Sequence, residues 1–422
     1  MIGILIGKLA TRMKRIKTIS LLVILTVFFS ACTVGRFFKW NFANIDDYKR
    51  FKNAPVANDP SNLYTFATGT DSLIFPKLKV KDEEFIFEEG LEESKTVAFL
   101  VIRNDTLLYE KYFDKYTRET WVNSFSVAKS FVSTLVGIAI NDGLIESIDD
   151  PIGKYVPELG EAYGEVSLRH VLEMRSGVKY KEAYYSPFSD AAVDYYGTKI
   201  KKRYPKFELE NEPDTYFQYR SINTQLLAEV VENVTGKKVS EYLEEKIWKP
   251  LGMESPASWS IDNKKDSTMK AFCCLNATAR DFAKFGLLFL NEGSWQGRQV
   301  VPKEWVKKAT TYDRPKNNFI YTYQWWTNRS YDTLGTPGFD VKQMHDTVDY
   351  NGKSYYRYPD EDYMADGHLG QYIYVNPEQK MVIVRLGKKS GKITPGWSQY
   401  MQWIARKNGI DPEPIENKEE TD

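Results

Sequence analysis

Residues 126–140 of the sequence read SVAKSFVSTLVGIAI. This stretch is long and apolar, and the Asn141-Asp142-Gly143 that follows it is a combination that ends helices. Ser124 or Asn123 is available in front of it as an N-cap. We therefore predict a buried helix over residues 126–140.

Strands are predicted on both sides of this helix in the sequence. Residues 96–103 (TVAFLVIR) and 106–113 (TLLYEKYF) are apolar runs rich in β-formers, and Asn104-Asp105 between them indicates a hairpin turn. Residues 371–375 and 381–386 are predicted as strands around the turn Asn376-Pro377-Glu378. The two ends of the chain therefore supply strands to one sheet.

The region between these strands is mainly helical. Helices are predicted over residues 168–175, 223–234, 240–248 and 277–290, with a closing helix over 397–407. This order indicates an α/β (α+β) fold, in which a helical lobe is inserted into a layer completed by both ends of the chain. We assign residues 61–148 and 269–422 to the α/β core lobe and residues 149–268 to the inserted helical lobe.

Composition excludes several classes of protein. The chain has 422 residues, with 57 Lys and Arg against 57 Asp and Glu, so it lacks the basic excess usual in nucleic-acid binders. Three Cys are too few for a disulfide-framework scaffold. Together with only three His, they leave few ligands for a His/Cys zinc site. We expect no metal, no organic cofactor and no nucleic-acid partner, and the composition leaves the oligomeric state open.

The N-terminus has the pattern of an export signal. Residues 21–29 (LLVILTVFF) are apolar, five basic residues and no acid precede them, and Ser30-Ala31-Cys32 follows. We predict that residues 1–31 are a lipoprotein signal peptide, starting at Met1 or Met13, and that Cys32 is lipidated. An uncleaved anchor helix is the alternative. Residues 32–60 are predicted as a tether with an early packing segment.

This signal predicts a protein that is exported and anchored to the cell envelope, in the periplasm or at the outer membrane of a bacterium. The attachment to the membrane would be through the lipid on Cys32. Removal of the five basic residues leaves 52 basic against 57 acidic residues, a net charge of −5. Surface charge is therefore not expected to be what holds the mature chain at the membrane.

A serine nucleophile is the favoured chemistry. Ser126 and Lys129 form an S-x-x-K pattern, which also occurs at Ser176 and Ser267, but only Ser126 opens a long buried helix. Residues three apart share a helix face, and burial disfavours a charged ammonium, so Lys129 is placed to activate the hydroxyl of Ser126. A Ser N-cap with a snorkelling Lys is the structural alternative.

Other hydrolytic chemistry has less support in the sequence. There is no G-x-S-x-G elbow and no H-E-x-x-H pattern. A Ser-His-Asp triad would need one of the three His. His170 lies on an apolar helix and is expected to be structural, and His345 lies in a polar loop where exposure is expected.

At this point the sequence resembles the serine β-lactamase-like hydrolases, from about residue 96 to residue 386. This superfamily contains class C β-lactamases, DD-peptidases, related esterases and 6-aminohexanoate-dimer hydrolases. Six blocks agree in order with motifs of these proteins: SFSVAKSF, DDPIGKYVP, SLRHVLEMRSGV, PDTYFQY, NATARDFAKFGLLFLNEG and GHLGQYIYVNP. The resemblance implies a β-lactamase/DD-peptidase-like fold, with an antiparallel sheet flanked by helices.

The resemblance also implies roles for particular residues. Ser126 would be the acylated nucleophile and Lys129 its activating partner, while Tyr219 would act as a general base and then as the acid for the leaving group. The backbone N–H groups of Ser126 and Gln371 would form the oxyanion hole. His368 and Gly370 would belong to the third motif and contact the substrate.

Departures from the family pattern bear on the substrate. Ser221 stands where the second motif usually has Asn, and His368 stands where β-lactamases have a Lys that meets a substrate carboxylate. Both departures count against β-lactam hydrolysis. The G-x-x-G-Q form of the third motif and the stretch MRSGVKYKEAYYSP resemble the aminohexanoate-dimer hydrolase and esterase branch. We predict a serine hydrolase that cleaves a small ester or amide, including short peptides, with Ser221 at the substrate. A DD-peptidase or β-lactamase, and a non-catalytic binding lipoprotein on the same fold, are the alternatives.

Two further features are left open by the sequence. Cys273 and Cys274 are adjacent, and we expect buried free thiols there, with a vicinal disulfide or a reactive thiol as the alternative. Trp325 and Trp326 are expected to lie in the core or, alternatively, to line the cleft.

Overall fold

A computed structural model describes residues 33–40, 42–311, 321–327, 331–332, 346–350, 353–357, 361–394 and 396–409. The predicted signal peptide, Cys32 and His345 lie outside these residues. In the part of the chain that is described, no helix is both long enough and apolar enough to cross a membrane.

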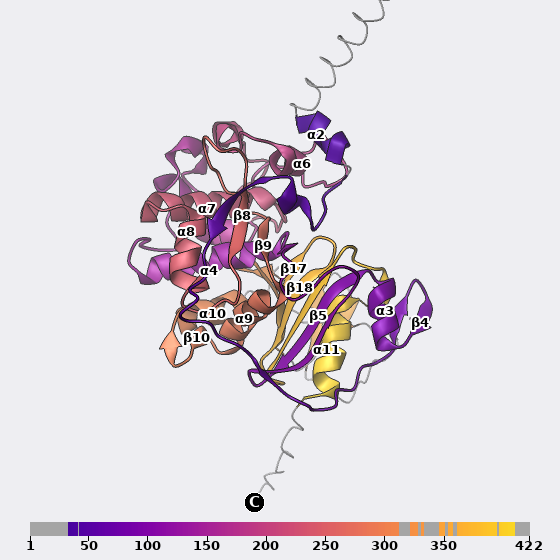
Figure 1. The fold of residues 1–422 in the computed structure, drawn as a ribbon. Coiled ribbons are helices and arrows are strands. Elements are labelled where there is room, and N and C mark those ends of the chain that lie inside the picture. Colours follow the sequence, from indigo (N-terminus) through magenta and orange to yellow (C-terminus); the bar gives the residue numbers. More distant parts are fainter. Residues whose placement is uncertain are drawn as a thin grey trace, which may run out of the picture.

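An eight-stranded sheet forms the centre of one lobe, with β5, β17 and β18 in Figure 1. Its pairings are antiparallel except for the edge pair of β2 and β6. This is the α/β architecture with an antiparallel sheet that the sequence predicts. In spatial order the strands are β12 Tyr321–Thr322, β13 Trp325–Thr327, β17 Tyr363–Gly367, β18 Gln371–Asn376, β19 Met381–Gly387, β5 Thr96–Arg103, β6 Thr106–Tyr112 and β2 Ala67–Thr68.

Both faces of this sheet are covered, which explains why its central strands are apolar throughout. Along β5, Phe99 and Val101 point into one core, where they pack with residues of α11 (Trp397–Lys407) and α3 (Phe87–Glu93). Leu100 and Ile102 point into the other core, which contains α9 (Ala279–Leu290) and α4 (Val127–Asn141). The alternation follows from the two-residue period of a strand.

The helical lobe contains α4 together with helices from the middle of the chain (Figure 1). The helix predicted over 126–140 is confirmed as α4, which is buried along nearly its whole length and packs against α7. The other helices are α5 Leu168–Leu172, α6 Asp190–Tyr196, α7 Ser221–Thr235, α8 Val239–Leu243 and α10 Lys303–Thr310. Short turns of 3-10 or π-helix are Asp47–Lys49, Ile152–Lys154, Pro157–Leu159, Glu161–Tyr163, Lys201–Lys206 and Glu244–Trp248.

The helical lobe also holds a four-stranded sheet that the sequence did not predict. Its order is β1 (Lys52–Val56), β8 (Ala257–Ile261), β9 (Leu275–Ala277) and β7 (Val122–Asn123). Small peripheral sheets are β20 Ile393–Thr394 with β3 Leu78–Val80 and β4 Glu83–Phe85, β10 Ser294–Trp295 with β11 Arg298–Gln299, and β14 Tyr331–Asp332 with β16 Lys353–Arg357 and β15 Asp346–Tyr350.

Residues 32–60, predicted as a tether, are packed over most of their length. Helix α2 (Thr33–Trp40) contacts α6, and β1 pairs with β8 in antiparallel register from Lys52 to Val56. The segment is polar in composition, but Lys52–Val56 pair in a sheet and Phe37 is buried against α6, whereas Phe38 and Phe42 are exposed. The early packing segment that we predicted therefore takes up nearly the whole stretch.

Candidate active site

Ser126 and Lys129 are brought together by the first turn of α4. Ser126 precedes the helix, and Lys129 Nζ donates a hydrogen bond to Ser126 Oγ at 2.9 Å. A second bond of 2.6 Å runs from Lys129 Nζ to the carbonyl oxygen of Phe272. Lys129 is 1% exposed, whereas Ser126 lines an open cavity. The pair therefore combines a buried amine with an accessible hydroxyl.

Burial lowers the pKa of Lys129 to about 8, from an ordinary value of 10.5, and the charge of Glu182 opposes this effect. A charged ammonium loses hydration when it is buried, so the neutral amine is favoured. A neutral amine has a lone pair that can accept the proton of the Ser126 hydroxyl. The other two S-x-x-K pairs differ, since Lys179 Nζ pairs with Glu208 and Lys270 Nζ donates to main-chain oxygens.

Tyr219 lies at the same site, two residues before α7. Its hydroxyl is hydrogen-bonded to the Ser126 side chain, and its ring centroid lies 5.2 Å from Lys129 Nζ. Burial raises the pKa of Tyr219 far above its ordinary value, the bond to Ser126 lowers it, and the charges of Glu182 and Asp366 raise it further. The phenol is therefore protonated at neutral pH, which suits an acid rather than the general base that the resemblance implied.

Aromatic residues hold Tyr219 in place. Trp326 stacks on it with ring centroids 5.7 Å apart, and Tyr321 meets it edge-on at 5.7 Å. Trp325, on the opposite face of the same strand, packs in the core against Phe289 at 4.3 Å. Trp325 is thus in the core, as expected, whereas Trp326 contacts Tyr219 and is not among the residues that line the cavity in front of Ser126.

The third motif forms the turn between β17 and β18 and approaches the nucleophile closely. A Cβ atom on Gly367 would lie 2.4 Å from Ser124 O and 3.3 Å from Ser126 N, so only glycine permits this approach. Gln371 opens β18 opposite Gly367, and its side chain bonds to His368 O and Gly387 O. The start of β18 is thereby fixed beside the backbone of Ser126.

Arg385 supports this turn from behind, and no motif in the sequence marks it. The guanidinium is fully buried and donates to Gly370 O at 2.6 Å and to Ser94 O at 3.0 Å. Gly370 has φ of +81°, and a Cβ there would lie 2.1 Å from an Arg385 nitrogen. Arg385 thus occupies the space beside Gly370 and orients the third motif.

His368 is packed between aromatic rings. Its ring centroid lies 5.4 Å from that of Phe125 and 5.3 Å from that of Tyr184. Burial lowers the pKa of His368 below its ordinary value, so the ring is neutral at pH 7. A neutral His368 ring does not attract the anionic substrate group that a Lys at this position would bind. His170, by contrast, is structural, because its Nδ1 accepts from Ser167 N at the start of α5.

Glu182 is a site residue that the sequence analysis missed. Its carboxylate accepts from Ser221 N at 2.7 Å, Ser221 Oγ at 2.6 Å and Tyr184 OH at 2.7 Å. An anion at the N-terminus of α7 is favoured by the helix dipole. The hydroxyl of Ser221, predicted to contact substrate, is therefore engaged by Glu182. Glu182 and Tyr184 lie in the loop between α5 and α6, residues 173–189, which we call the Tyr-rich loop. This loop carries no motif that would have marked the two residues.

A cavity of about 490 Å³, counting its open mouth, lies in front of Ser126. Its walls include Ser221, Phe272, Cys273 and His368 together with aromatic and small residues. None of the described lining residues has a side chain that is ionised at pH 7. The cavity is therefore suited to an uncharged group of small to moderate size.

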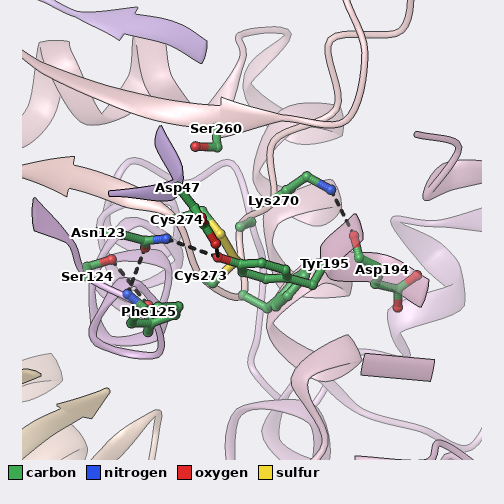
Figure 2. The surroundings of a disulfide bond; sticks show 12 residues. Asp47, Asn123, Ser124, Phe125, Asp194, Tyr195, Ser260, Lys270, Cys273 and Cys274 are labelled. Carbon is green, nitrogen blue, oxygen red and sulfur yellow. Dashed lines mark hydrogen bonds between the residues drawn. A yellow bond between two sulfur atoms is a disulfide. The ribbon is translucent and has the colours of Figure 1, made fainter. Parts of the chain in front are cut away.

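Cys273 and Cys274 form a vicinal disulfide, so the expectation of free thiols is wrong (Figure 2). Free thiols are the common state of buried Cys, but here the chain turns between the two residues, and Cys274 has φ of +72°. Phe272, whose carbonyl holds Lys129, directly precedes the disulfide, and Cys273 lines the cavity. The disulfide is thus part of the wall that positions the lysine.

A hydrogen-bonded chain beside the disulfide supports the residue in front of Ser126. In Figure 2, Tyr195 OH lies between Asp47 and Asn123, donating to Asp47 Oδ2 at 2.7 Å and accepting from Asn123 Nδ2 at 3.5 Å. Asn123 Oδ1 in turn accepts from Phe125 N at 3.0 Å. Phe125 has φ of +45°, and these hydrogen bonds hold that conformation.

In the described residues, no three His, Cys, Asp or Glu side chains are grouped so as to hold a metal ion.

Known proteins resemble this chain in sequence and in fold. The β-lactamase family model matches residues 86–399. The 6-aminohexanoate-dimer hydrolase of Paenarthrobacter ureafaciens is 32% identical over 57% of this chain and 66% of the relative, so the chain spans slightly less than two thirds of that protein.

Solved structures show the same fold. "Putative 6-aminohexanoate-dimer hydrolase from Bacillus anthracis" has a TM-score of 0.70 at 23% identity, covering 87% of this chain and 92% of that chain. The octameric penicillin-binding protein homologue from Pyrococcus abyssi has a TM-score of 0.53 at 21% identity, covering 72% of each chain. The chain belongs to the β-lactamase family, and its 32% identical relative is a hydrolase.

Proposed function

We propose that this protein is a serine hydrolase that cleaves a small ester or amide through an acyl-enzyme on Ser126. The observation that carries the proposal is the contact of Lys129 Nζ with Ser126 Oγ at 2.9 Å, with Lys129 buried and Ser126 open to the cavity. A lysine with a lowered pKa next to an accessible serine is an activated nucleophile. The 32% identical aminohexanoate-dimer hydrolase supports amide or ester chemistry.

In the acylation step, Ser126 Oγ forms a bond to the substrate carbonyl carbon while Lys129 Nζ accepts the hydroxyl proton. The negative charge that develops on the carbonyl oxygen is stabilised by the backbone N–H groups of Ser126 and Gln371, each contributing about 3–4 kcal/mol. The bond to the leaving group then breaks, and Tyr219 OH donates a proton to the departing oxygen or nitrogen. A proton passed from the Lys129 ammonium to the Tyr219 phenolate restores both groups.

Water completes the cycle. A water molecule attacks the acyl carbon and its proton passes to Lys129, and the bond to Ser126 Oγ then breaks as the Lys129 ammonium returns that proton to the oxygen. The same oxyanion contacts serve this second step, because the tetrahedral geometry is the same. The products are a carboxylic acid and an alcohol or amine.

The cavity supports an uncharged acyl group, and two observations count against β-lactams. His368 occupies the position of the carboxylate-binding Lys and is neutral at pH 7, because burial lowers its pKa. The hydroxyl of Ser221 is bonded to Glu182 and does not replace the missing Asn of the second motif. We therefore propose esters and amides rather than β-lactams or D-Ala-D-Ala peptides as substrates.

A panel of chromogenic substrates tests this proposal. p-Nitrophenyl esters, aminohexanoate-type amides, D-Ala-D-Ala peptides and nitrocefin would be compared on wild type and on Ser126→Ala. The matched control is Ser133→Ala on the same helix, since Ser133 Oγ is buried and makes no hydrogen bond in the described structure. We expect ester or amide turnover in wild type and Ser133→Ala, and none in Ser126→Ala.

A fluorophosphonate probe separates the alternatives. Labelling of wild type and Ser133→Ala, with none of Ser126→Ala, supports the serine mechanism. Equal labelling of all three proteins, or of none, contradicts it and favours a binding protein. Turnover of nitrocefin that exceeds ester turnover would instead favour a β-lactamase.

We also propose that the chain is exported and attached to the cell envelope at Cys32.

A further inference from the structure

An exposed aromatic rim surrounds one side of the cavity mouth. It consists of Phe38 and Phe42 from the N-terminal segment and Tyr185 and Phe188 from the Tyr-rich loop, and these side chains are 66%, 46%, 73% and 76% exposed. Phe42 and Tyr185 touch across the two segments, with ring centroids 5.9 Å apart. Four large exposed aromatic side chains on neighbouring segments mark an interaction surface.

The rim is continuous with the wall of the cavity. Ala43, next to Phe42, and Tyr184, next to Tyr185, both line the cavity in front of Ser126. The rim is held by α2, because Phe37 packs edge-on against Tyr196 of α6 at 5.3 Å. Whatever covers the aromatic rim therefore lies at the entrance to the candidate active site.

A basic groove lies on the other side of α2. It is lined by Thr33 and Arg36 at the start of α2 and by Lys199, Lys202 and Lys206 beyond α6. Within the described part of the chain, no carboxylate lies within ion-pair distance of these three lysines. Arg203 and Asp194 also line the groove, but they neutralise each other in an ion pair. The groove therefore presents an excess of positive charge.

The position of Cys32 in the sequence indicates what covers the aromatic rim and the basic groove. Cys32 directly precedes Thr33, the first residue of α2, and consecutive Cα atoms are only about 3.8 Å apart. With Cys32 lipidated as proposed, or with the apolar run at 21–29 kept as an anchor, the bilayer would begin within a few residues of α2. With no tether between them, the surface beside α2 must lie close to the membrane.

We propose that the aromatic rim and the basic groove together form a docking face for an anionic phospholipid bilayer, which seats the mouth of the cavity on the membrane surface. Aromatic side chains favour the interface between headgroups and acyl chains. Lysines close to an anionic leaflet are attracted by its surface potential. The face thus has the two chemical features of a peripheral membrane contact, and both lie beside the point of attachment. This docking rests on the predicted membrane attachment and is independent of the proposed hydrolase activity.

The experiment measures contact of the face with lipid in the full chain. Phe188→Cys and, as the matched control on the other lobe, Ile86→Cys (59% exposed) are labelled with the fluorophore NBD and reconstituted in vesicles. Cys273 and Cys274 are bonded to each other, and wild type taken through the same labelling gives the background from Cys32. Quenching by lipids with a doxyl group near the headgroup is read in phosphatidylcholine with phosphatidylglycerol and in phosphatidylcholine alone.

We expect quenching at position 188 to exceed that at position 86 at least about fivefold in the anionic vesicles, since shallow quenchers act over short range. Quenching should fall at least about threefold without phosphatidylglycerol, and equally when Lys202→Glu and Lys206→Glu are added. Circular dichroism verifies that these variants are folded, and Lys202→Ser with Lys206→Ser replaces them if they are not.

Three results would overturn the proposal. One is equal quenching at positions 188 and 86. Another is quenching at 188 that is unchanged by anionic lipid and by the lysine substitutions. The last is a label at 188 that is shielded from water but not quenched by lipid, which would mean that a protein or a second copy covers the face.

Discussion

The pH dependence of Ser126 acylation tests the central feature of the site, the lowered pKa of Lys129. Desolvation reduces this pKa from 10.5 to about 8, and the carboxylate of Glu182 acts in the opposite direction. The proposed mechanism requires the neutral amine, because only that form can accept the hydroxyl proton. The rate should therefore follow the neutral fraction of Lys129.

The expected magnitude follows from this pKa. At pH 7, a lysine with a pKa of 8 is neutral in about one molecule in ten, whereas at 10.5 it would be neutral in about one in three thousand. Burial thus enriches the reactive form about 300-fold, which corresponds to about 3 kcal/mol. Below pH 8 the rate should rise about tenfold per pH unit, and above it the rate should level off.

The assay is the second-order rate constant for labelling of Ser126 by a fluorophosphonate, measured from about pH 5.5 to about pH 9.5. Lys129→Arg should abolish labelling at every pH, because a guanidinium remains charged throughout this range. His368→Gln serves as the control for the other titrating group at the site. Since burial lowers the pKa of His368 below 6.5, a limb due to that residue would appear below pH 6.5.

Three outcomes would refute the reasoning. A midpoint below pH 6.5 that disappears in His368→Gln would identify the histidine as the base. A rate that does not change with pH, or a Lys129→Arg variant that retains labelling, would show that Lys129 does not take the proton. A midpoint near pH 8 that persists in His368→Gln confirms the assignment.

Three further predictions concern the surroundings of Lys129. Tyr219→Phe should lower kcat for amides by about 10²- to 10⁴-fold and affect activated esters less, because a good leaving group needs no proton; equal loss on both substrates would contradict an acid role. Glu182→Gln should move the acid limb to lower pH, since the charge of Glu182 raises the pKa of Lys129; pH profiles of the two proteins that coincide would exclude this coupling. Replacing Cys273 and Cys274 together by Ser should lower kcat more than it raises KM, because the carbonyl that holds Lys129 lies directly before them; an unchanged kcat with the disulfide shown absent by mass spectrometry would separate the disulfide from catalysis.

The fold could be predicted from the sequence wherever the signal is local. The helix over 126–140 and the strands β5, β18 and β19 were found to within two residues, because an apolar run bounded by turn residues is visible in one window. Strand β1 was not, because its partner β8 lies about 200 residues away and its own composition is polar. Pairing at such a distance leaves no trace in a short window.

The residues of the candidate site also differ in whether local sequence predicts them. Ser126 and Lys129 are three residues apart and could be argued from helix geometry, whereas Tyr219, Gln371 and His368 were located only by resemblance to a family. Glu182 and Arg385 were missed, since neither belongs to a motif. Glu182 reaches Ser221 across 39 positions, and Arg385 reaches Ser94 across 291. A carboxylate or guanidinium that supports a site from outside its motifs is revealed only by the folded structure.

The roles of Lys129 and Tyr219 follow from a single cause acting on groups of opposite charge. Burial removes hydration from both, which lowers the pKa of the amine to about 8 and raises that of the phenol, so the phenol is neutral at pH 7 and the amine loses its charge as the pH rises through 8. In the reactive form, in which Lys129 and His368 are neutral and no ionised side chain lines the cavity, the site holds little charge. Charge would then appear mainly in the transition state, on the substrate oxygen. The backbone amides of Ser126 and Gln371 would therefore supply the largest part of the stabilisation, and Arg385, which orients Gly370 next to Gln371, would influence the rate without touching the substrate.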